Sequence, residues 1–242
     1  MNLRQLFPIL MSFMLFQQSG FGADPELEWS LFRGTMGQDS GQATAIDRWG
    51  NVRITGSTSG AFPGHSNEDG KLDGFLATYT HEPCRSFSAK QWGGAGHDNA
   101  NSIAVDLLGY VHIVGHSSPA PNPTTGFYRK YDPLGRLCWE KQIDIGKNPR
   151  ATACISDGCM GVLVTGFAYS DHDANGIFTF VRRYDRCGKE LWTTRLGDAP
   201  GEKPSATRGN SLARLSNGDV LVAGSVWRRL DGEPTCCLYI SL

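Results

Sequence analysis

The side chains best placed to bind a ligand lie in one short loop, Asp171-His172-Asp173-Ala174-Asn175-Gly176. Asp171, Asp173 and Asn175 supply oxygen donors at relative positions 1, 3 and 5, and the glycine at position 6 permits the sharp turn that aims them at one ion. The acid that closes an EF-hand is missing, because Arg182 stands at position 12. The loop predicts either a calcium site at these three residues or a solvated turn capped by its Asx side chains.

The residue patterns that would support catalysis are less complete than this loop. His97-Asp98 offers half of a catalytic triad, but no Gly-x-Ser-x-Gly nucleophile elbow occurs in the sequence. His112 and His116 are four residues apart and lack a third zinc ligand nearby. Asp47 and Asp106 occupy equivalent places in a repeated block and are the nearest candidates for an acidic site in a central channel. The sequence therefore assigns no catalytic residue.

These residues belong to a block that returns four times along the 242 residues. Each copy contains a strand of the form Val-x-Ile/Val-x-Gly, which ends at Gly56, Gly115, Gly166 and Gly224, at intervals of 59, 51 and 58 residues. An aromatic residue recurs with similar spacing at Trp29, Phe87, Trp139 and Trp192. Short strands and turns at this period predict a β-propeller with one blade per repeat. The glycine that ends each strand predicts a close backbone approach or a β-bulge.

The pattern Phe-x-x-x-Tyr-Asp-x-x-Gly-x-x-x-Trp, which runs from Phe127 to Trp139, follows a strand of the form Ala-Val-Asp-x-x-Gly-x-Val-x-Ile-x-Gly. Together these patterns resemble the bacterial β-propeller repeat called SBBP. The last copy, around Asn217-Gly218-Asp219, is similar to the related delta-60 repeat. The resemblance implies a secreted or surface β-propeller without a shared set of catalytic residues.

The predicted fold is all-β: a β-propeller of four blades with four strands each. The blades cover approximately residues 33–92, 93–144, 145–197 and 198–242, and residues 27–32 supply the strand that completes the last blade. Closure of this kind leaves no open sheet edge. The alternatives are an open arc of blades, or half of a larger ring that a second chain completes.

Residues 1–23 have the layout of a secretory signal peptide. Arg4 is the only charged residue before Asp24, and an apolar run from Leu6 to Phe16 precedes small residues. The run is too short for a stable membrane span, and the alternative is an uncleaved interfacial segment. We therefore expect an exported protein with a mature domain at 24–242, located in the periplasm, on the cell surface or outside the cell.

The number of cysteines limits the possible disulfides, and the net charge limits the classes of binding partner. Seven cysteines leave at least one without an intramolecular partner, and Cys154 and Cys159 flank a turn where they would form a short disulfide or pack as small apolar residues. With 23 basic and 24 acidic residues, the net charge of −1 argues against nucleic acid as the main partner.

The functional prediction is an exported, non-enzymatic scaffold, a monomer or dimer that binds a protein or glycan partner. We expect binding through the loops at 57–73, 117–125, 169–175 and 225–234, because loops vary freely on a rigid frame of strands. No cofactor other than calcium is indicated. The alternatives are a lyase or hydrolase with a site at the central channel, and a truncated structural member of a longer propeller family.

Overall fold

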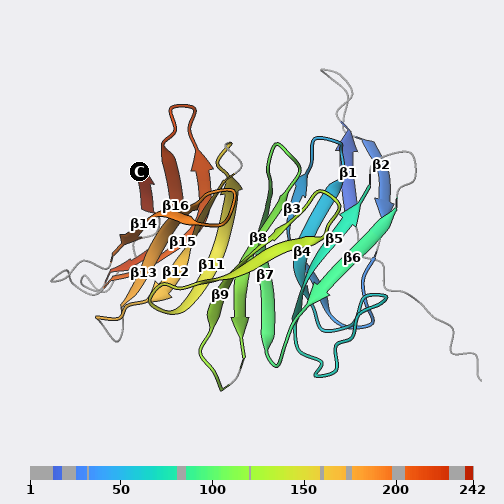
Figure 1. Cartoon of the computed structure of the whole chain (residues 1–242), viewed down its shortest axis with the longest axis horizontal. Helices are drawn as coiled ribbons and strands as arrows, with labels where there is room; N and C mark the ends of the chain where they lie inside the picture. The colour runs from blue at the N-terminus through green and yellow to red at the C-terminus, as the bar shows by residue number, and fades with distance from the viewer. Residues whose placement is uncertain are drawn as a thin grey trace, which may run out of the picture.

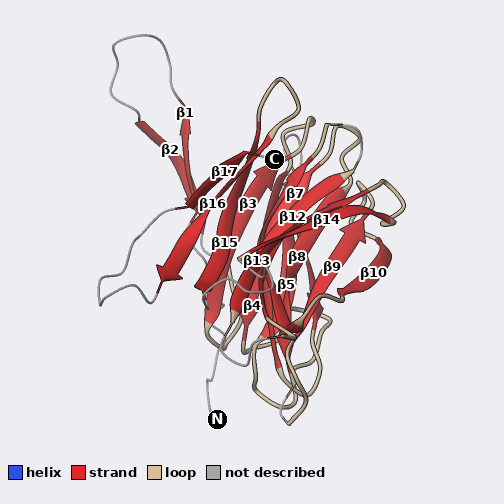
Figure 2. Cartoon of the chain, turned by 90° about the vertical axis from the view of Figure 1, so that its left-hand side faces the viewer, coloured by secondary structure: helices blue, strands red, loops and turns tan. Residues whose placement is uncertain are grey.

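The computed structural model describes residues 13–17, 26–31, 33–80, 86–119, 121–158, 161–172, 176–197, 205–228 and 238–241, and all regular structure in these ranges is β (Figure 2). No helix in this part of the chain is long and apolar enough to cross a membrane. The strands are β1 (Phe13–Gln17), β2 (Glu26–Leu31), β3 (Asp39–Ile46), β4 (Val52–Thr58), β5 (Asp73–Tyr79), β6 (Phe87–Trp92), β7 (His97–Val105), β8 (Val111–Ser118), β9 (Thr125–Tyr131), β10 (Leu137–Ile143), β11 (Lys147–Ser156), β12 (Val162–Tyr169), β13 (Ile177–Tyr184), β14 (Glu190–Leu196), β15 (Ser205–Arg214), β16 (Val220–Arg228) and β17 (Leu238–Ser241).

After the β1–β2 hairpin, the strands form four antiparallel meanders, each made of strands consecutive in sequence. We call them sheet I (β3–β6), sheet II (β7–β10), sheet III (β11–β14) and sheet IV (β15–β17). One parallel pair, Ile177 with Ala206, also links sheets III and IV at the backbone. Figure 1 shows the four sheets standing side by side in a row, from sheet I on the right to sheet IV on the left.

The sheets pack in one repeated manner, with the first strand of each sheet laid over the first three strands of the preceding sheet. β7 packs over β3 to β5, β11 over β7 to β9, and β15 over β11 to β13. Side chains alternate between the two faces of a strand, so the second strand of an inner sheet contributes apolar residues to both neighbours. Ile113 thus joins the core between sheets I and II, whereas Val114 joins the core between sheets II and III.

A β-bulge lies at the same place in the first strand of every sheet, opposite the glycine that ends the repeated motif. The bulges fall between Gly41 and Ala43, Ala100 and Ser102, Ala151 and Ala153, and Gly209 and Ser211. A β-carbon added to the facing glycine would lie 1.9, 1.9, 2.0 and 2.1 Å from a main-chain oxygen at Gly56, Gly115, Gly166 and Gly224 respectively. The predicted close backbone approach is therefore confirmed in all four repeats.

The expected closure of the ring by residues 27–32 is wrong. Strand β2 pairs with β1 over five residue pairs, from Phe13–Leu31 to Gln17–Glu26, and not with sheet IV. Sheets I and IV lie at opposite ends of the row, so the described part of the chain is an open stack (Figure 1). Residues 1–12 and 18–25 lie outside the described ranges, and the signal peptide stays a prediction.

The outer face of sheet I is covered by segments of its own repeat. Phe62, in the segment between β4 and β5, packs against Phe75 and Phe87 with ring centroids 5.3 and 6.2 Å apart. The guanidinium of Arg33 lies 5.2 Å from the centroid of the Phe87 ring. As a result, Ile54 and Phe75 are buried on a face that has no neighbouring sheet.

The two ends of the sheets differ in their connections. Tight turns follow the first strand of each sheet and run along the upper edge in Figure 1, whereas the longer segments between the second and third strands run along the lower edge. The lower edge includes the described parts of the predicted loops at 57–73, 117–125 and 169–175. Residues 229–234 of the fourth predicted loop, at 225–234, lie outside the described ranges.

Replacement of Gly115 by alanine should lower the free energy of unfolding by about 2 kcal/mol or more, because the new methyl group would collide with a main-chain carbonyl that cannot move without breaking the bulge. Urea denaturation would measure the loss. Gly94→Ala is the matched control, since a β-carbon there has no heavy atom within 4 Å, and it should change stability by only a few tenths of a kcal/mol. Equal stability of the two variants would contradict the role assigned to the bulge.

Candidate binding pockets between the sheets

An aspartate caps the turn between the first and second strands in sheets I, II and III. Asp106 Oδ1 accepts hydrogen bonds from the amides of Leu108 and Tyr110, at 2.9 and 3.0 Å. Asp47 Oδ1 and Asp157 Oδ1 accept equivalent bonds from the amides of Asn51 and Gly161, at 2.9 Å each. The side-chain oxygen satisfies amides that a tight turn leaves without partners, which accounts for aspartate at this place.

The other carboxylate oxygen of each aspartate receives a side-chain donor. Arg53 reaches Asp47 at 3.2 Å, His112 reaches Asp106 at 3.4 Å, and Arg183 reaches Asp157 at 2.8 Å. Burial acts to raise the pKa of Asp106, but the hydrogen bonds from His112 and the turn amides outweigh it and hold that pKa below its ordinary value. Asp106 is thus a buried, ionised and fully bonded group.

His112 connects this aspartate to the core between sheets II and III. Its side chain is fully buried, with Nε2 toward Asp106 and Nδ1 2.6 Å from the hydroxyl of Tyr128. Burial lowers the pKa of His112, so the ring is neutral near pH 7. Because an ionised carboxylate can only accept, Nε2 carries the proton and the Tyr128 hydroxyl donates to Nδ1. His112 and Tyr128 are fully buried, so these two groups stabilise the core and are not accessible to a substrate.

Asp47 and Asp106 do not form the acidic channel site that was considered. They lie in different sheets, and each one caps a turn and binds a donor of its own sheet. The sequence signal for this role was present in the short turn that follows each aspartate. The sequence does not reveal the buried donor, because Arg53 and His112 read as variable residues within an apolar strand.

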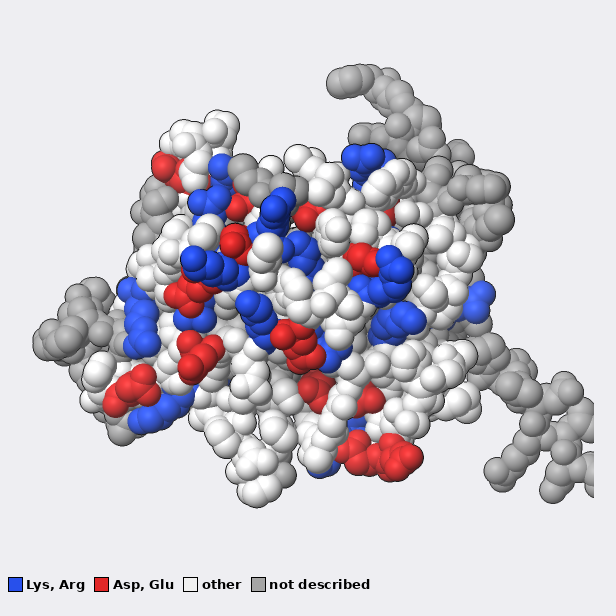
Figure 3. All heavy atoms as spheres, in the orientation of Figure 1, with Lys and Arg blue, Asp and Glu red and all other residues white. Residues whose placement is uncertain are grey.

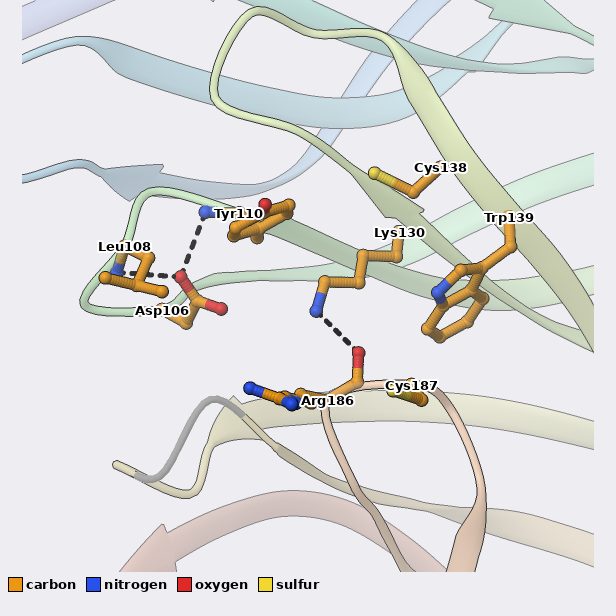
Figure 4. A pocket seen from close by; sticks show the side chains of 8 residues that line it. All are labelled: Asp106, Leu108, Tyr110, Lys130, Cys138, Trp139, Arg186 and Cys187. Carbon is orange, nitrogen blue, oxygen red and sulfur yellow. Dashed lines mark hydrogen bonds between the residues drawn. The ribbon is translucent and has the colours of Figure 1, made fainter.

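A pocket of about 470 Å³ opens beside Asp106, between the turns of sheets II and III. Its lining consists of Asp106, Leu108, Tyr110, Lys130, Cys138, Trp139, Arg186 and Cys187. Figure 4 shows Lys130 crossing the pocket from β9, with Tyr110 on one side and Trp139 on the other. The Lys130 ammonium donates to the main-chain oxygen of Arg186 at 2.8 Å and lies 4.6 Å from the centroid of the Tyr110 ring.

The Trp139 side chain packs between sheets II and III. Its ring meets Tyr128 edge-on at a centroid distance of 4.7 Å, and a β-carbon at Gly188 would lie 2.7 Å from it. The Lys141 ammonium lies 5.6 Å from the centroid and donates to the main-chain oxygen of Gly188 at 2.8 Å. The ring therefore forms a wall of the pocket and holds the turn of sheet III in place.

A second pocket, of about 480 Å³, lies in the corresponding place between sheets III and IV. Its lining includes Asp157, Arg183, Trp192 and Arg214, together with Leu163, Thr194, Gly218 and Val220. Arg214 donates to the main-chain oxygen of Asp157 at 2.6 Å, so a cation again connects adjacent sheets. Asp157 and Trp192 are the repeat equivalents of Asp106 and Trp139.

The two pockets share a charge pattern. Each one combines a buried turn aspartate with two cationic side chains, namely Lys130 and Arg186 in the first and Arg183 and Arg214 in the second. In the first pocket, Lys130 bonds only the main-chain oxygen of Arg186, and no described residue makes a hydrogen bond or ion pair with the Arg186 guanidinium. Each lining therefore carries one more positive than negative charge, even though Arg183 is paired with Asp157 in the second pocket. Sequence reasoning missed these residues, although a basic residue precedes the tyrosine in both copies, at Lys130 and Arg183.

The predicted calcium loop is only partly described. Asp171 is exposed, whereas Asp173 and Asn175 lie outside the described residues. Ser170 closes the base of the loop through a 2.8 Å bond from its amide to the main-chain oxygen of Gly176. The described ranges contain no group of three His, Cys, Asp or Glu side chains that could hold a metal ion. Calcium at Asp171, Asp173 and Asn175 stays a prediction.

The histidines and cysteines singled out from the sequence have separate surroundings. His97 Nδ1 accepts from the amide of Leu72 at 3.3 Å. Burial, with a smaller effect of Arg150, lowers the pKa of His116 to about 4. Cys154 is a free, buried thiol whose pKa burial raises to about 12. Cys159, with which a short disulfide was one of two alternatives, lies outside the described residues.

Asp98, the partner of His97 in the sequence motif, faces another buried acid across the interface of sheets I and II. Asp73 accepts from Gln91 Nε2 at 2.8 Å, and Asp98 accepts from the amide of Gly94 at 3.2 Å. Only 6% and 7% of their respective surfaces are exposed. Burial is the main cause that raises the pKa of both carboxyls, and the charge of Asp73 raises that of Asp98 further.

No protein-family model and no curated protein matches the chain. Among solved structures, the chain is similar to a GH43 endo-arabinanase from Bacillus licheniformis, with 10% identity and a TM-score of 0.38 over 82% of this chain and 71% of that one. A likeness at this level supports no conclusion about fold or activity. The resemblance to SBBP and delta-60 repeats stays a prediction.

Asp106→Asn should lower the free energy of unfolding at pH 7 by about 2 kcal/mol, because the new amide would point a donor at His112. The stabilisation by Asp106 is present above its ordinary pKa and is lost as the pH falls through its lowered folded value. The free energy of unfolding of the variant should therefore fall less steeply on acidification than that of the parent. Asp132→Asn, which caps a turn in the same way without a buried histidine, is the control and should cost less.

Asp98→Asn should act in the opposite direction and raise stability at pH 7 by about 1 kcal/mol. An acid with a raised folded pKa binds its proton more tightly in the native state, so stability falls as the pH rises from the ordinary value toward the folded one. Urea unfolding between pH 4 and pH 7 would measure this slope, which the variant should reduce. A variant less stable than the parent at pH 7 would refute the cost assigned to the buried, ionised Asp98 carboxylate.

Proposed function

We propose that the chain is an exported, non-enzymatic scaffold of propeller type, with its sheets in an open stack, and that it binds carboxylate-bearing protein or glycan ligands. The ligand occupies the pockets between sheets II and III and between sheets III and IV. Export and a calcium ion in the loop at Asp171, Asp173 and Asn175 belong to the same proposal, and they rest on the sequence patterns.

One observation carries this proposal: the same pocket recurs at two successive interfaces with the same kinds of residue. A buried aspartate, two cations and a tryptophan line both pockets. The second cation comes from a different position in each, namely Arg186 of sheet III in the first pocket and Arg214 of sheet IV in the second. Core packing alone does not require a second cation at each place. A ligand with carboxylate groups would pair with it, because guanidinium and ammonium groups bind carboxylates through charge-assisted hydrogen bonds.

The wider surface fits a selective anion pocket better than a general polyanion site. Figure 3 shows Lys and Arg interspersed with Asp and Glu over the visible face, without a broad patch of one sign. This face lacks the basic stripe that nucleic acids need. Local pockets with excess positive charge favour short acidic segments instead.

The pockets lie along the edge of the sheets that carries the tight turns. The long loops, through which the sequence predicts binding, lie at the opposite edge. Asp106, Leu108 and Tyr110 belong to the turn after β7, and Arg186 and Cys187 belong to the turn after β13. The proposal therefore assigns acidic ligands to the turn edge and leaves the long loops free for the predicted calcium ion and for a further partner.

The alternative of a lyase or hydrolase finds its best residues in Asp73 and Asp98. Two buried carboxyls with raised pKa values are the kind of pair that acid–base chemistry uses. They differ from the pockets in position, since they lie between sheets I and II. A chain that turns over glycans, and loses this activity in Asp98→Asn but not in Arg186→Ala, would favour the enzyme over the scaffold.

Arg186→Ala should weaken binding of an acidic ligand about tenfold, because it removes a charge whose side chain has no bond to another described residue. The probes are hexaglutamate peptide and hexagalacturonate, each compared with its neutral analogue by isothermal titration calorimetry. Binding should also weaken as salt rises, because the charges are near the surface.

Arg136→Ala is the matched control. Arg136 is an exposed arginine on the equivalent turn of sheet II, where it pairs with Asp132 outside the pockets, and its loss should leave affinity unchanged. Identical affinities for acidic and neutral probes, or equal losses in both variants, would refute the proposed carboxylate pocket. Binding of one acidic probe but not the other would identify the ligand as peptide or as glycan.

A further inference from the structure

We infer that the open end of the stack is an interface, and that sheet IV of one chain receives strand β3 of a second copy in a head-to-tail assembly. This inference is independent of the proposed ligand pockets. It concerns the two faces of the sheet row that have no sheet beside them, and it uses the packing rule that the three internal interfaces already follow.

The outward face of sheet IV has the character of an internal face. Leu212, Val220 and Val222 point toward sheet III and are buried in its core. Alternation along the strands therefore turns Ser211, Ala213, Leu221 and Ala223 the other way, as the pairs Ala213–Leu221 and Ser211–Ala223 show. These four side chains are uncharged and mostly small, so another strand could approach closely.

The corresponding faces of the other sheets are covered. The positions equivalent to Leu221 and Ala223 are Arg53 and Thr55 in sheet I, His112 and Val114 in sheet II, and Leu163 and Thr165 in sheet III, with exposed fractions between 0% and 3%. In sheet IV, by contrast, Ala213 is exposed and Leu221 and Ala223 are only half-buried. The fourth face thus presents interface-type residues to solvent.

Strand β3 is the matching surface at the other end. In each internal interface the first strand of the next sheet makes the contact, through Ile103, Cys154 or Leu212. Thr44 stands at this register in β3, paired with Ile54, and is exposed, and Ile46 two residues later is 61% exposed. Phe62 and Arg33 cover the outer face of β5 and β6, and they leave β3 itself open.

The size of the surface sets the expected strength. Strands β15 and β16, with ten and nine residues, present a face of about 30 Å by 10 Å, or roughly 300 to 400 Å² per chain. The total of about 600 to 800 Å² is below the roughly 1,000 Å² of a stable specific interface, so we expect weak, transient association that becomes visible only at high micromolar concentration. Because the two faces differ, the assembly is a closed ring if the rotation closes and a filament if it does not.

The test measures the mass of the purified chain by light scattering between 1 and 200 µM, together with the variants Ala213→Arg and Thr44→Arg. Both substitutions introduce a charge at an exposed position, so circular dichroism and the melting temperature should be unchanged. The parent chain should associate as its concentration rises, and each variant should associate at least tenfold more weakly. Gln142→Arg, on the exposed outer strand β10, is the control and should associate like the parent.

Mixing the two variants gives the sharpest outcome. Chains with Ala213→Arg keep an intact β3, and chains with Thr44→Arg keep an intact sheet IV, so an equimolar mixture should recover heterodimers that neither variant forms alone. A parent chain that stays monomeric at 200 µM would overturn the inference. Loss of association in Ala213→Arg but not in Thr44→Arg would also overturn it, because sheet IV would then pair with itself.

Discussion

The close approach between a bulged first strand and the glycine opposite it determines the shape of every sheet in this molecule. At Gly115 a main-chain oxygen occupies the volume that any other side chain would need, and the same holds at the three equivalent glycines. A bulge increases the local twist and bends the strand that carries it. In sheets II, III and IV the bent first strand lies over the preceding sheet, so the packing at all three interfaces depends on positions without side chains.

Polar groups at the turn edge complete the interfaces that the bulges make possible. Lys130 and Arg53 each donate to a carbonyl in the next sheet, at Arg186 and at Pro133 respectively. Such bonds fix the rotation of one sheet against the next, because apolar packing alone has little directional preference. They also leave cations beside buried aspartates, and the pockets exist where these side chains do not fill the space between two turns.

The sequence predicts the strands and the glycine contacts well, because both depend on residues close together in the chain. Val-x-Ile-x-Gly specifies a buried strand and its end without knowledge of distant partners. It does not predict the partner of β2, since a short strand pairs with whichever edge the tertiary structure offers, and here this is β1. The pockets escape prediction for the same reason: Lys130 and the carbonyl it binds are 56 residues apart and meet only through the packing of two sheets.

The capped outer face of sheet I gives the stack a direction. Phe62 and the Phe87 ring bury this face with residues of the first repeat alone, so the first sheet completes one side of its core without waiting for later segments. Each following sheet needs only the one before it, and its strands are neighbours in sequence. The chain is therefore suited to vectorial folding, in which structure grows from the amino-terminal repeat at the pace at which the polypeptide emerges from the ribosome or from a translocation channel.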